Sequence, residues 1–323
     1  MTSSIKISVN INTVKIISVL ILSFFIASCG NSNVRPESPK WKNISAGGFS
    51  KVFLYVPKNI SPIGKGRSLM MVLHGCVQEA VDFKLANLDL VAEKYGMVIA
   101  LPQAEFQSHL GCWDYRSSNR GRNDGDYENL INLAKNLTAR KNLIIDPDQI
   151  YIAGLSSGAS FAMTTACIAP DIFAGMGAFA GPSLGTHADG SAMRIDSDMN
   201  TAATNCKQYG HSYKKYFADQ VASFAQGEND SIVNHDYLKI NADAMSAVYK
   251  IASSPQKTKQ IQPQITEYLY ENGRVSRITI KRFGHEWPAG LNAGGGFISD
   301  IKFNYGMYLA EYFMINNKRV LKN

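Results

Sequence analysis

The sequence predicts an α/β fold with a mostly parallel central sheet and helices on both of its faces. Three observations lead to this prediction. Short apolar runs alternate with longer stretches that have apolar residues at helical spacing. Most of these runs are continuously apolar, which is typical of strands buried on both faces. The alternation extends over one large domain, and a chain of 323 residues, 45% of them hydrophobic, can bury such a core.

The predicted strands are short, and several end at a glycine or a proline. The first has half-buried alternation, and the next five are apolar runs. The last two are joined by Glu271-Asn272-Gly273, a sequence typical of a tight hairpin. In chain order, the predicted strands are 49–57, 68–73, 97–101, 149–153, 173–180 and 218–225, followed by the hairpin 268–280.

Stretches with helical spacing separate these runs. The first of them, 81–95, places Leu88, Val91 and Tyr95 on one face. The predicted helices are 81–95, 126–140, 157–166, 235–251 and 300–314. Between 181 and 213 the sequence is irregular, polar and rich in glycine, which predicts a small lid or a long loop.

Residues 1–28 resemble the signal peptide of a bacterial lipoprotein. Lys6 and Lys15 precede an apolar run at 16–26, which is too short to span a bilayer as a helix. A positive start, a short apolar run and small residues before a cleavage site are typical of a secretory signal. The sequence Ile-Ala-Ser-Cys ends at Cys29 and resembles a lipobox, which implies that this cysteine is lipidated. An ordinary signal peptide with an incidental cysteine is the alternative.

Three segments follow from this interpretation. We expect a signal peptide at 1–28, a polar tether at 29–47 and one domain at 48–323. The protein is then exported. It is attached to a bacterial membrane through Cys29, at the outer membrane or the cell surface, or it is secreted.

The charge of the chain does not indicate a nucleic-acid partner. The formal net charge is +7 at pH 7, but lysine and arginine are scattered and form no dense basic run. Such a charge is typical of a mildly basic, solvated surface. The sequence has neither zinc-finger spacing nor an RNP motif, and we expect no nucleic acid among the partners.

The sequence Gly-Leu-Ser-Ser-Gly at 154–158 lies between a predicted strand and a predicted helix. This is the setting of a nucleophile elbow, in which two glycines allow a sharp turn and the central Ser156 stands at the helix N-terminus. Backbone N–H groups at that end have no partner within the helix and can stabilise negative charge. The setting predicts that Ser156 is a covalent nucleophile, and a structural Gly-Ser turn is the alternative.

A serine hydroxyl needs a general base to attack at neutral pH. His285 is the candidate base, because it lies just past the last predicted strand and before the last predicted helix. Asp230 follows the strand predicted at 218–225 and is the candidate acid that orients His285 and stabilises its cation. Glu228 is the competing acid.

Negative charge forms on the substrate carbonyl oxygen during attack, and two backbone N–H groups usually stabilise it. One is expected from Ser157, which directly follows the nucleophile. The second is expected from the turn His74-Gly75-Cys76 after an early strand, and we assign it to Cys76. His74 itself is expected to support this turn rather than to act as a base.

Five motifs occur in an order that resembles one enzyme family. They are HGCVQ at 74–78, CWDY at 112–115, GLSSGA at 154–159, GxxDxxV at 227–233 and GHEWP at 284–288. Together, over roughly residues 48–315, they resemble the polyhydroxybutyrate depolymerase family of esterases. That family includes relatives that act on feruloyl and acetyl xylan esters.

The resemblance implies the α/β-hydrolase fold. It also implies a triad of Ser156, Asp230 and His285, with an oxyanion hole at Cys76 and Ser157. The resemblance implies neither a metal ion nor another cofactor. These residues come from distant parts of the chain, and we expect the fold to bring them together.

Apart from Cys29, the chain has four cysteines, and an even number in an exported protein is consistent with two disulfides. Three pairings are possible. Cys76 and Cys112 flank the proposed cleft, and we predict that they pair. This leaves Cys167 and Cys206 as the second pair.

Trp113 and Trp287 are the predicted walls for the acyl or polymer chain. The sequence thus predicts an exported serine esterase that acts through an acyl-enzyme on poly(3-hydroxybutyrate)-type oligomers or related esters. Feruloyl or acetyl xylan esters are the alternative substrates, and a serine peptidase on the same fold is the alternative enzyme. A catalytically silent, surface-binding lipoprotein is the alternative outside enzymes, and the three filled triad positions argue against it.

Overall fold

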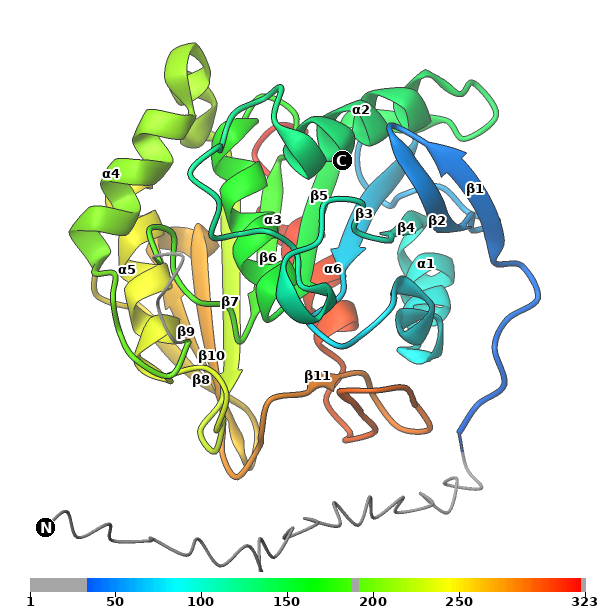
Figure 1. Cartoon of the computed structure of the whole chain (residues 1–323). Helices are drawn as coiled ribbons and strands as arrows, with labels where there is room; N and C mark the ends of the chain where they lie inside the picture. Colours follow the sequence, from blue (N-terminus) through cyan, green and yellow to red (C-terminus); the bar gives the residue numbers. More distant parts are fainter. Residues whose placement is uncertain (1–33, 187–191, 321–323) are drawn as a thin grey trace, which may run out of the picture. The chain divides into compact units, whose positions relative to one another are not determined.

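A ten-stranded sheet runs through the computed structural model, which describes residues 34–186 and 192–320 (Figure 1). The strands are β1 (Lys42–Ala46), β2 (Phe49–Tyr55), β3 (Arg67–Leu73), β4 (Met97–Pro102), β5 (Ile145–Leu155), β6 (Gly175–Phe179), β7 (Val221–Gly227), β8 (Lys257–Gln262), β9 (Ile265–Tyr270) and β10 (Val275–Ile280). Their order in the sheet is β1-β2-β4-β3-β5-β6-β7-β10-β9-β8. The central strands from β4 to β10 are parallel, and antiparallel strands complete both edges. A separate small sheet pairs β11 (Trp287–Pro288) with β12 (Ile298–Ser299).

Helices cover both faces of this sheet. One face packs against α2 (Gly125–Ala139), α3 (Ser157–Ile168) and α5 (Asp236–Tyr249), with α4 (Met199–Tyr209) packed on α3 and α5. The other face packs against α1 (Leu88–Tyr95) and α6 (Tyr305–Asn316). Short 3₁₀ helices occur at Ala80–Leu85, His109–Gly111, His211–Ala218 and Glu271–Gly273. The mostly parallel sheet between two helical layers confirms the predicted fold class.

Burial explains why the central strands could be recognised. Every residue of β4 and of β6 is buried, and β3 is buried after its first residue. Continuous apolar runs are what such two-sided burial requires. In a parallel sheet the carboxyl ends of the strands lie at one edge, so the segments that follow β3, β5 and β7 come together there.

The single helix predicted at 81–95 is wrong. The structure has a 3₁₀ helix at Ala80–Leu85 and then α1, and Asn87 separates them with φ 55°. Asparagine adopts this left-handed conformation more readily than most residues. The Asn87 side chain also donates to the backbone oxygens of Ala289 and Leu291, at 3.0 and 3.1 Å. At this break, the side chain of Asn87 therefore holds the chain segment that follows His285.

The stretch 181–213 is not irregular throughout, because it contains α4. The side chain of Asp198 accepts a hydrogen bond from the N–H of Thr201 and caps this helix. The buried face of α4 carries only alanines and Cys206, so its hydrophobic pattern in the sequence is weak. The prediction for 300–314 is also corrected, since α6 begins at Tyr305.

The domain begins earlier than residue 48. The strand β1 lies within the segment predicted as a tether, and its alternating polar residues gave it no continuous apolar run. Further upstream, the N–H of Arg35 donates to the oxygen of Asn292 at 2.8 Å, and Lys40 forms an ion pair with Glu93 at 2.7 Å. The predicted signal peptide and Cys29 lie outside the described residues. Within residues 34–186 and 192–320, no helix combines the length and apolarity needed to cross a bilayer.

Candidate active site

Ser156 stands at a sharp turn between β5 and α3. Its φ of 57° and ψ of −120° form a conformation that residues other than glycine rarely adopt. A Cβ atom on Gly154 would lie 2.5 Å from the backbone of Gly158, and one on Gly158 would lie 2.3 Å from the backbone oxygen of His74. Both neighbouring positions therefore require glycine, and this requirement is the physical content of the Gly-x-Ser-x-Gly motif.

Asp230 and His285 form a hydrogen-bonded pair from two neighbouring loops. Asp230 follows β7, and its Oδ2 lies 2.8 Å from Nδ1 of His285. The carboxylate is fully buried and the imidazole nearly so, with 0% and 7% of their side chains exposed. Backbone bonds hold the two loops together, since the N–H of Asn229 donates to the oxygen of Phe283 at 2.9 Å. The predicted acid Asp230 and the predicted base His285 are therefore in contact in the structure.

Three further donors hold the carboxylate of Asp230. The N–H groups of Ile232 and Val233 donate to its Oδ1, both at 2.9 Å, and Gln226 Nε2 donates to its Oδ2 at 3.1 Å. Burial raises the pKa of this carboxyl, but the bonds from His285 and the two backbone N–H groups outweigh burial and lower the pKa overall. Asp230 is therefore ionised at neutral pH, as a group that stabilises a histidine cation must be.

Glu228, the competing acid, is exposed to solvent. Its backbone N–H donates to the oxygen of Ile280 at 2.9 Å, which fixes the loop. Among the described residues, Asp230 is the carboxylate that bonds to His285. The geometry favours Asp230 over Glu228 as the orienting acid.

The turn after β3 lies directly against Ser156. A Cβ atom on Gly75 would lie 3.5 Å from the Cβ of Ser156. Within the described part of the chain, the N–H of Cys76 donates to no protein acceptor. Ser157 is the first residue of α3, where helical N–H groups have no intrahelical partner. Both predicted oxyanion donors therefore lie beside Ser156.

His74 and Gln78 support this turn. His74 is fully buried, and its Nδ1 lies 2.8 Å from the oxygen of Gly75 while its Nε2 accepts from the N–H of Ala104. Burial lowers the pKa of His74, so the ring is neutral. Gln78 accepts from the N–H of Gly75 at 2.7 Å and donates to the oxygen of Gly296. These contacts fit a structural role for His74.

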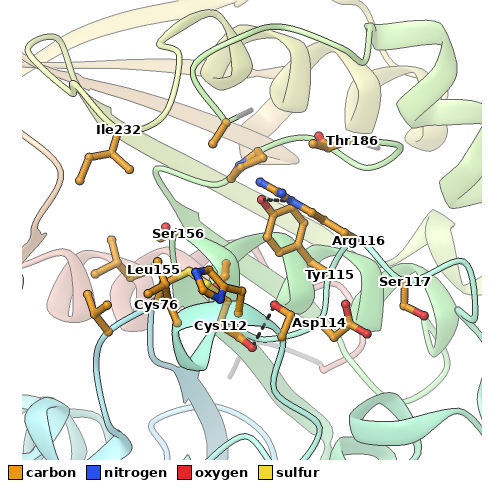
Figure 2. Close-up of a pocket in the computed structure, with 18 of the residues that line it drawn as sticks. Cys76, Cys112, Asp114, Tyr115, Arg116, Ser117, Leu155, Ser156, Thr186 and Ile232 are labelled. Carbon is orange, nitrogen blue, oxygen red and sulfur yellow. Dashed lines mark hydrogen bonds between the residues drawn. A yellow bond between two sulfur atoms is a disulfide. The ribbon is translucent and has the colours of Figure 1, made fainter. Parts of the chain in front are cut away.

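Ser156 and His285 open onto one cavity of about 1200 Å³ (Figure 2). In Figure 2, Ser156 and Cys76 lie on one side of this cavity, and Arg116 and Thr186 lie on the other. Its volume is slightly above the range of small-molecule sites, roughly 300–1,000 Å³. In the two described ranges, no cluster of three or more histidine, cysteine or acidic side chains has the arrangement of a metal site.

The model of one protein family matches residues 52–251, and its description is Esterase PHB depolymerase. The chain belongs to this family.

Two relatives resemble the chain over most of its length. A poly(3-hydroxybutyrate) depolymerase of Ralstonia pickettii is 34% identical over 291 residues, which cover 84% of this chain and 59% of that protein. An acetylxylan esterase of Coprinopsis cinerea is 24% identical over 251 residues, which cover 73% of this chain and 65% of that protein. The chain thus spans less than two thirds of the length of either relative.

Two solved structures share the α/β-hydrolase fold with the chain. An acetyl xylan esterase from Aspergillus awamori superimposes with a TM-score of 0.65 at 17% identity, over 76% of this chain and 93% of that one. A propionate-bound esterase from Thermogutta terrifontis superimposes with a TM-score of 0.53 at 16% identity, over 89% of this chain and 98% of that one. At these identities the likeness concerns the fold.

Both predicted disulfides are present in the structure. Cys76 bonds to Cys112 beside the cavity, and Cys167 in α3 bonds to Cys206 in α4. The first bond joins the turn at 74–76 to the loop at 110–112. The N–H of Val77 donates to the oxygen of Leu110 in that loop at 2.8 Å and reinforces the same connection.

The prediction that Trp113 and Trp287 form substrate walls is wrong. Both indoles are 0% exposed, and neither belongs to the cavity lining. Trp113 packs between His74 and Phe161, with ring centroids 5.5 and 5.1 Å away. Trp287 packs against Tyr305 and Phe83 on the other face of the sheet. Each tryptophan is therefore part of the packed core.

Sequence reasoning missed the side chains that do line the cavity. Near the pair of Asp230 and His285 they are Ile232 and Phe297, and the ring of Phe297 meets His285 edge-on at 6.4 Å. Ile232 lies two residues after Asp230, a position that could have indicated its role. Phe297 lies in an irregular, glycine-rich segment with no such signal.

Proposed function

We propose that this protein is an exported serine esterase that cleaves carboxylic esters through an acyl-enzyme on Ser156. The observation that carries the proposal is the hydrogen bond from His285 to the buried carboxylate of Asp230, because His285 lines the same cavity as Ser156. Poly(3-hydroxybutyrate)-type oligomers are the proposed substrates. A relative that is named a poly(3-hydroxybutyrate) depolymerase supports this choice.

The reaction proceeds in two steps. Nε2 of His285 removes the proton of Ser156 Oγ as the oxygen attacks the ester carbonyl, and Asp230 stabilises the imidazolium that forms. The N–H groups of Cys76 and Ser157 donate to the carbonyl oxygen as it becomes negative, and each such donor is worth roughly 2.7–4 kcal/mol in the transition state. The imidazolium gives its proton to the departing alcohol. His285 then activates a water molecule, which releases the acid and restores Ser156.

Acetyl xylan and feruloyl esters are the second class of proposed substrates, because relatives bear the names acetylxylan esterase and feruloyl esterase B. A panel of hydroxybutyrate oligomers, acetyl xylan, methyl ferulate and p-nitrophenyl acyl esters separates the two classes. The highest kcat/KM on hydroxybutyrate oligomers supports the first class. The highest kcat/KM on acetyl xylan or methyl ferulate rejects it.

Export and attachment through a lipid on Cys29 are part of the proposal. The two disulfides support export, because such bonds persist in oxidising compartments. Detergent phase partitioning of the full chain tests the lipid. Wild type is expected in the detergent phase, and Cys29→Ser in the aqueous phase. Equal partitioning of the two proteins rejects the anchor.

Labelling with a fluorophosphonate tests the nucleophile. Wild type is expected to react, and Ser156→Ala is expected to remain unlabelled. Ser183→Ala is a matched control, because Ser183 is buried and lies outside the cavity lining. An unlabelled, folded wild type would favour a surface-binding lipoprotein without catalysis.

A further inference from the structure

The cavity beside Ser156 has two ends of different polarity. The apolar end consists of Val77, Leu110, Ile232 and Phe297, which adjoin the oxyanion turn and the triad loops and are each at least partly exposed. The basic end consists of Tyr115, Arg116, Arg120, Asn205 and Tyr209, from the loop after Cys112 and from α4. Figure 2 shows Ile232 and Ser156 on one side, and Tyr115 and Arg116 on the other.

Arg120 is held in place, and no carboxylate in the described part of the chain forms an ion pair with it. Its Nη1 donates to the hydroxyl of Tyr209 at 2.9 Å, and its Nη2 donates to the backbone oxygen of Tyr115 at 3.0 Å. Its Nε is buried and has no protein acceptor among the described residues. Asp114 also lines the cavity, but neither it nor any other described carboxylate forms an ion pair with Arg120.

A partly buried guanidinium of this kind favours an anionic ligand. Withdrawing a charge from water is costly unless an opposite charge accompanies it. One N–H of each Nη of Arg120 fixes the side chain and Nε is buried, which leaves the second N–H of each Nη for a planar, bidentate acceptor. A carboxylate is the planar anion that this geometry suits. Arg116 adds a second guanidinium to the same end, and it also donates to the hydroxyl of Tyr115 at 2.9 Å.

We propose that the basic end binds the free carboxylate of a short hydroxy-acid oligoester, with Arg120 as its main ligand. The inference rests on the proposed function and names its substrate class. A hydroxybutyrate dimer is uncharged along its acyl half, where one hydroxyl is the polar group beside the ester, and it carries one carboxylate on its alcohol half. The acyl half then occupies the apolar end, and the alcohol half reaches Arg120 from the ester at Ser156.

This orientation separates the two steps of the reaction. Attack by Ser156 transfers the acyl half to the enzyme and releases the alcohol half as a hydroxy acid, together with its carboxylate. Water then releases the second hydroxy acid, so one dimer and one water give two hydroxy acids. Because the carboxylate leaves before deacylation, Arg120 contributes to substrate binding and acylation and not to deacylation. Arg120 is thus a positioning and specificity residue.

Kinetics on a matched substrate pair tests the proposal. The dimer acid and its methyl ester differ only in the carboxylate. The ratio of their kcat/KM values is expected to fall about 10- to 100-fold in Arg120→Gln, the range of hydrogen bonds to charged groups. Arg120→Lys keeps the charge without the fork, and an intermediate ratio is expected. Arg140→Gln is the control, because Arg140 donates to Asn136 and lies outside the cavity lining.

If the ratio of the two kcat/KM values is unchanged in Arg120→Gln, the proposal is overturned. An equal loss of activity on both substrates would then indicate a structural role for Arg120. Calorimetric binding to Ser156→Ala separates this failure from failure of the proposed function. The dimer acid is expected to bind more tightly than its methyl ester, and Arg120→Gln in the same background is expected to remove the difference. Equal binding of both to Ser156→Ala also rejects the subsite. An acetylated xylo-oligosaccharide with one uronic acid that binds more tightly than the dimer acid assigns the carboxylate to a sugar instead.

Discussion

Removal of the two disulfides one at a time separates their effect on stability from their effect on catalysis. The bond Cys76–Cys112 joins the turn at 74–76, which carries the proposed oxyanion donor, to the neighbouring loop, whereas Cys167–Cys206 joins α3 to α4. We expect both double alanine variants to lose stability to a similar extent. Only the variant without the first bond is expected to lose a large part of kcat, because the Cys76 N–H is then no longer fixed beside Ser156.

The magnitude follows from the size of the loops that the bonds close. The sequence separations are 36 and 39 residues. In the chain-entropy model, a bond closing a loop of either length stabilises the fold by about 4 kcal/mol, and the two values differ by about 0.1 kcal/mol. At about 2–4 °C per kcal/mol for a domain of this size, each variant is expected to lose roughly 10 °C in Tm. Complete loss of an oxyanion donor costs about 10²–10³ in kcat, which sets the upper limit for the first variant.

Differential scanning calorimetry and kinetics with a p-nitrophenyl ester, both at a temperature where every variant is folded, measure the two effects. The expected result is a similar fall in Tm with at least a roughly tenfold difference in kcat between the variants, within the limit set by one oxyanion donor. An equal loss of kcat in the two variants refutes the assignment of Cys76 to the oxyanion hole. Equal kcat values at the wild-type level refute it as well.

Further predictions concern three single residues. Asp230→Asn is expected to lower kcat by about 10²–10⁴-fold, because the base loses its orienting charge, as steady-state kinetics will show. The interactions that lower the Asp230 pKa stabilise the fold above its unfolded value of about 3.9, and this contribution is lost as the pH falls through the lower folded value. The Tm advantage of wild type over Asp230→Asn is therefore expected to narrow below about pH 4, and a constant advantage contradicts the assigned pKa direction. Gly158→Ala places a Cβ 2.3 Å from a backbone oxygen and is expected to cost about 1–3 kcal/mol in urea unfolding, whereas Gly296→Ala has no atom within 4 Å and serves as its control. Trp113→Phe is expected to lower Tm while KM for small esters stays within about twofold, and a larger change in KM restores Trp113 as a substrate wall.

The central strands and the motifs at their carboxyl ends were predictable because each depends on local physics. Two-sided burial gives continuous apolar runs such as Leu69–Leu73. The elbow needs glycine at 154 and 158 because backbone atoms lie within 2.5 Å of a Cβ at either position. Such requirements appear in the sequence at fixed spacing from the strand, and they led to Ser156.

Other elements depend on tertiary context that the sequence does not display. The strands β1 and β8 lie at the edges of the sheet and carry exposed polar residues, so they lack an apolar run. The helix α4 buries only alanines and Cys206, so its apolar pattern in the sequence is weak, and the bond from Cys206 to Cys167 attaches it to α3. The break at Asn87 exists because its side chain holds a segment two hundred residues later in the chain.

The substrate walls were predicted incorrectly for a related reason. An aromatic residue beside a catalytic motif fits a wall and a support equally well from the sequence alone. Trp113 and Trp287 are fully buried supports. The cavity is lined instead by residues such as Phe297 and Arg120, which lie in segments without periodic pattern. Only the folded chain brings them to Ser156.

The covalent intermediate provides the most direct test of the central claim that Ser156 is the nucleophile of an ester hydrolase. Rapid quenching of the wild type with p-nitrophenyl butyrate, followed by mass analysis of peptides, is expected to find the butyryl group on Ser156. A burst of p-nitrophenolate close to one equivalent per active site is expected to accompany it. A butyryl group on another residue, or an undiminished burst in Ser156→Ala, would contradict the account.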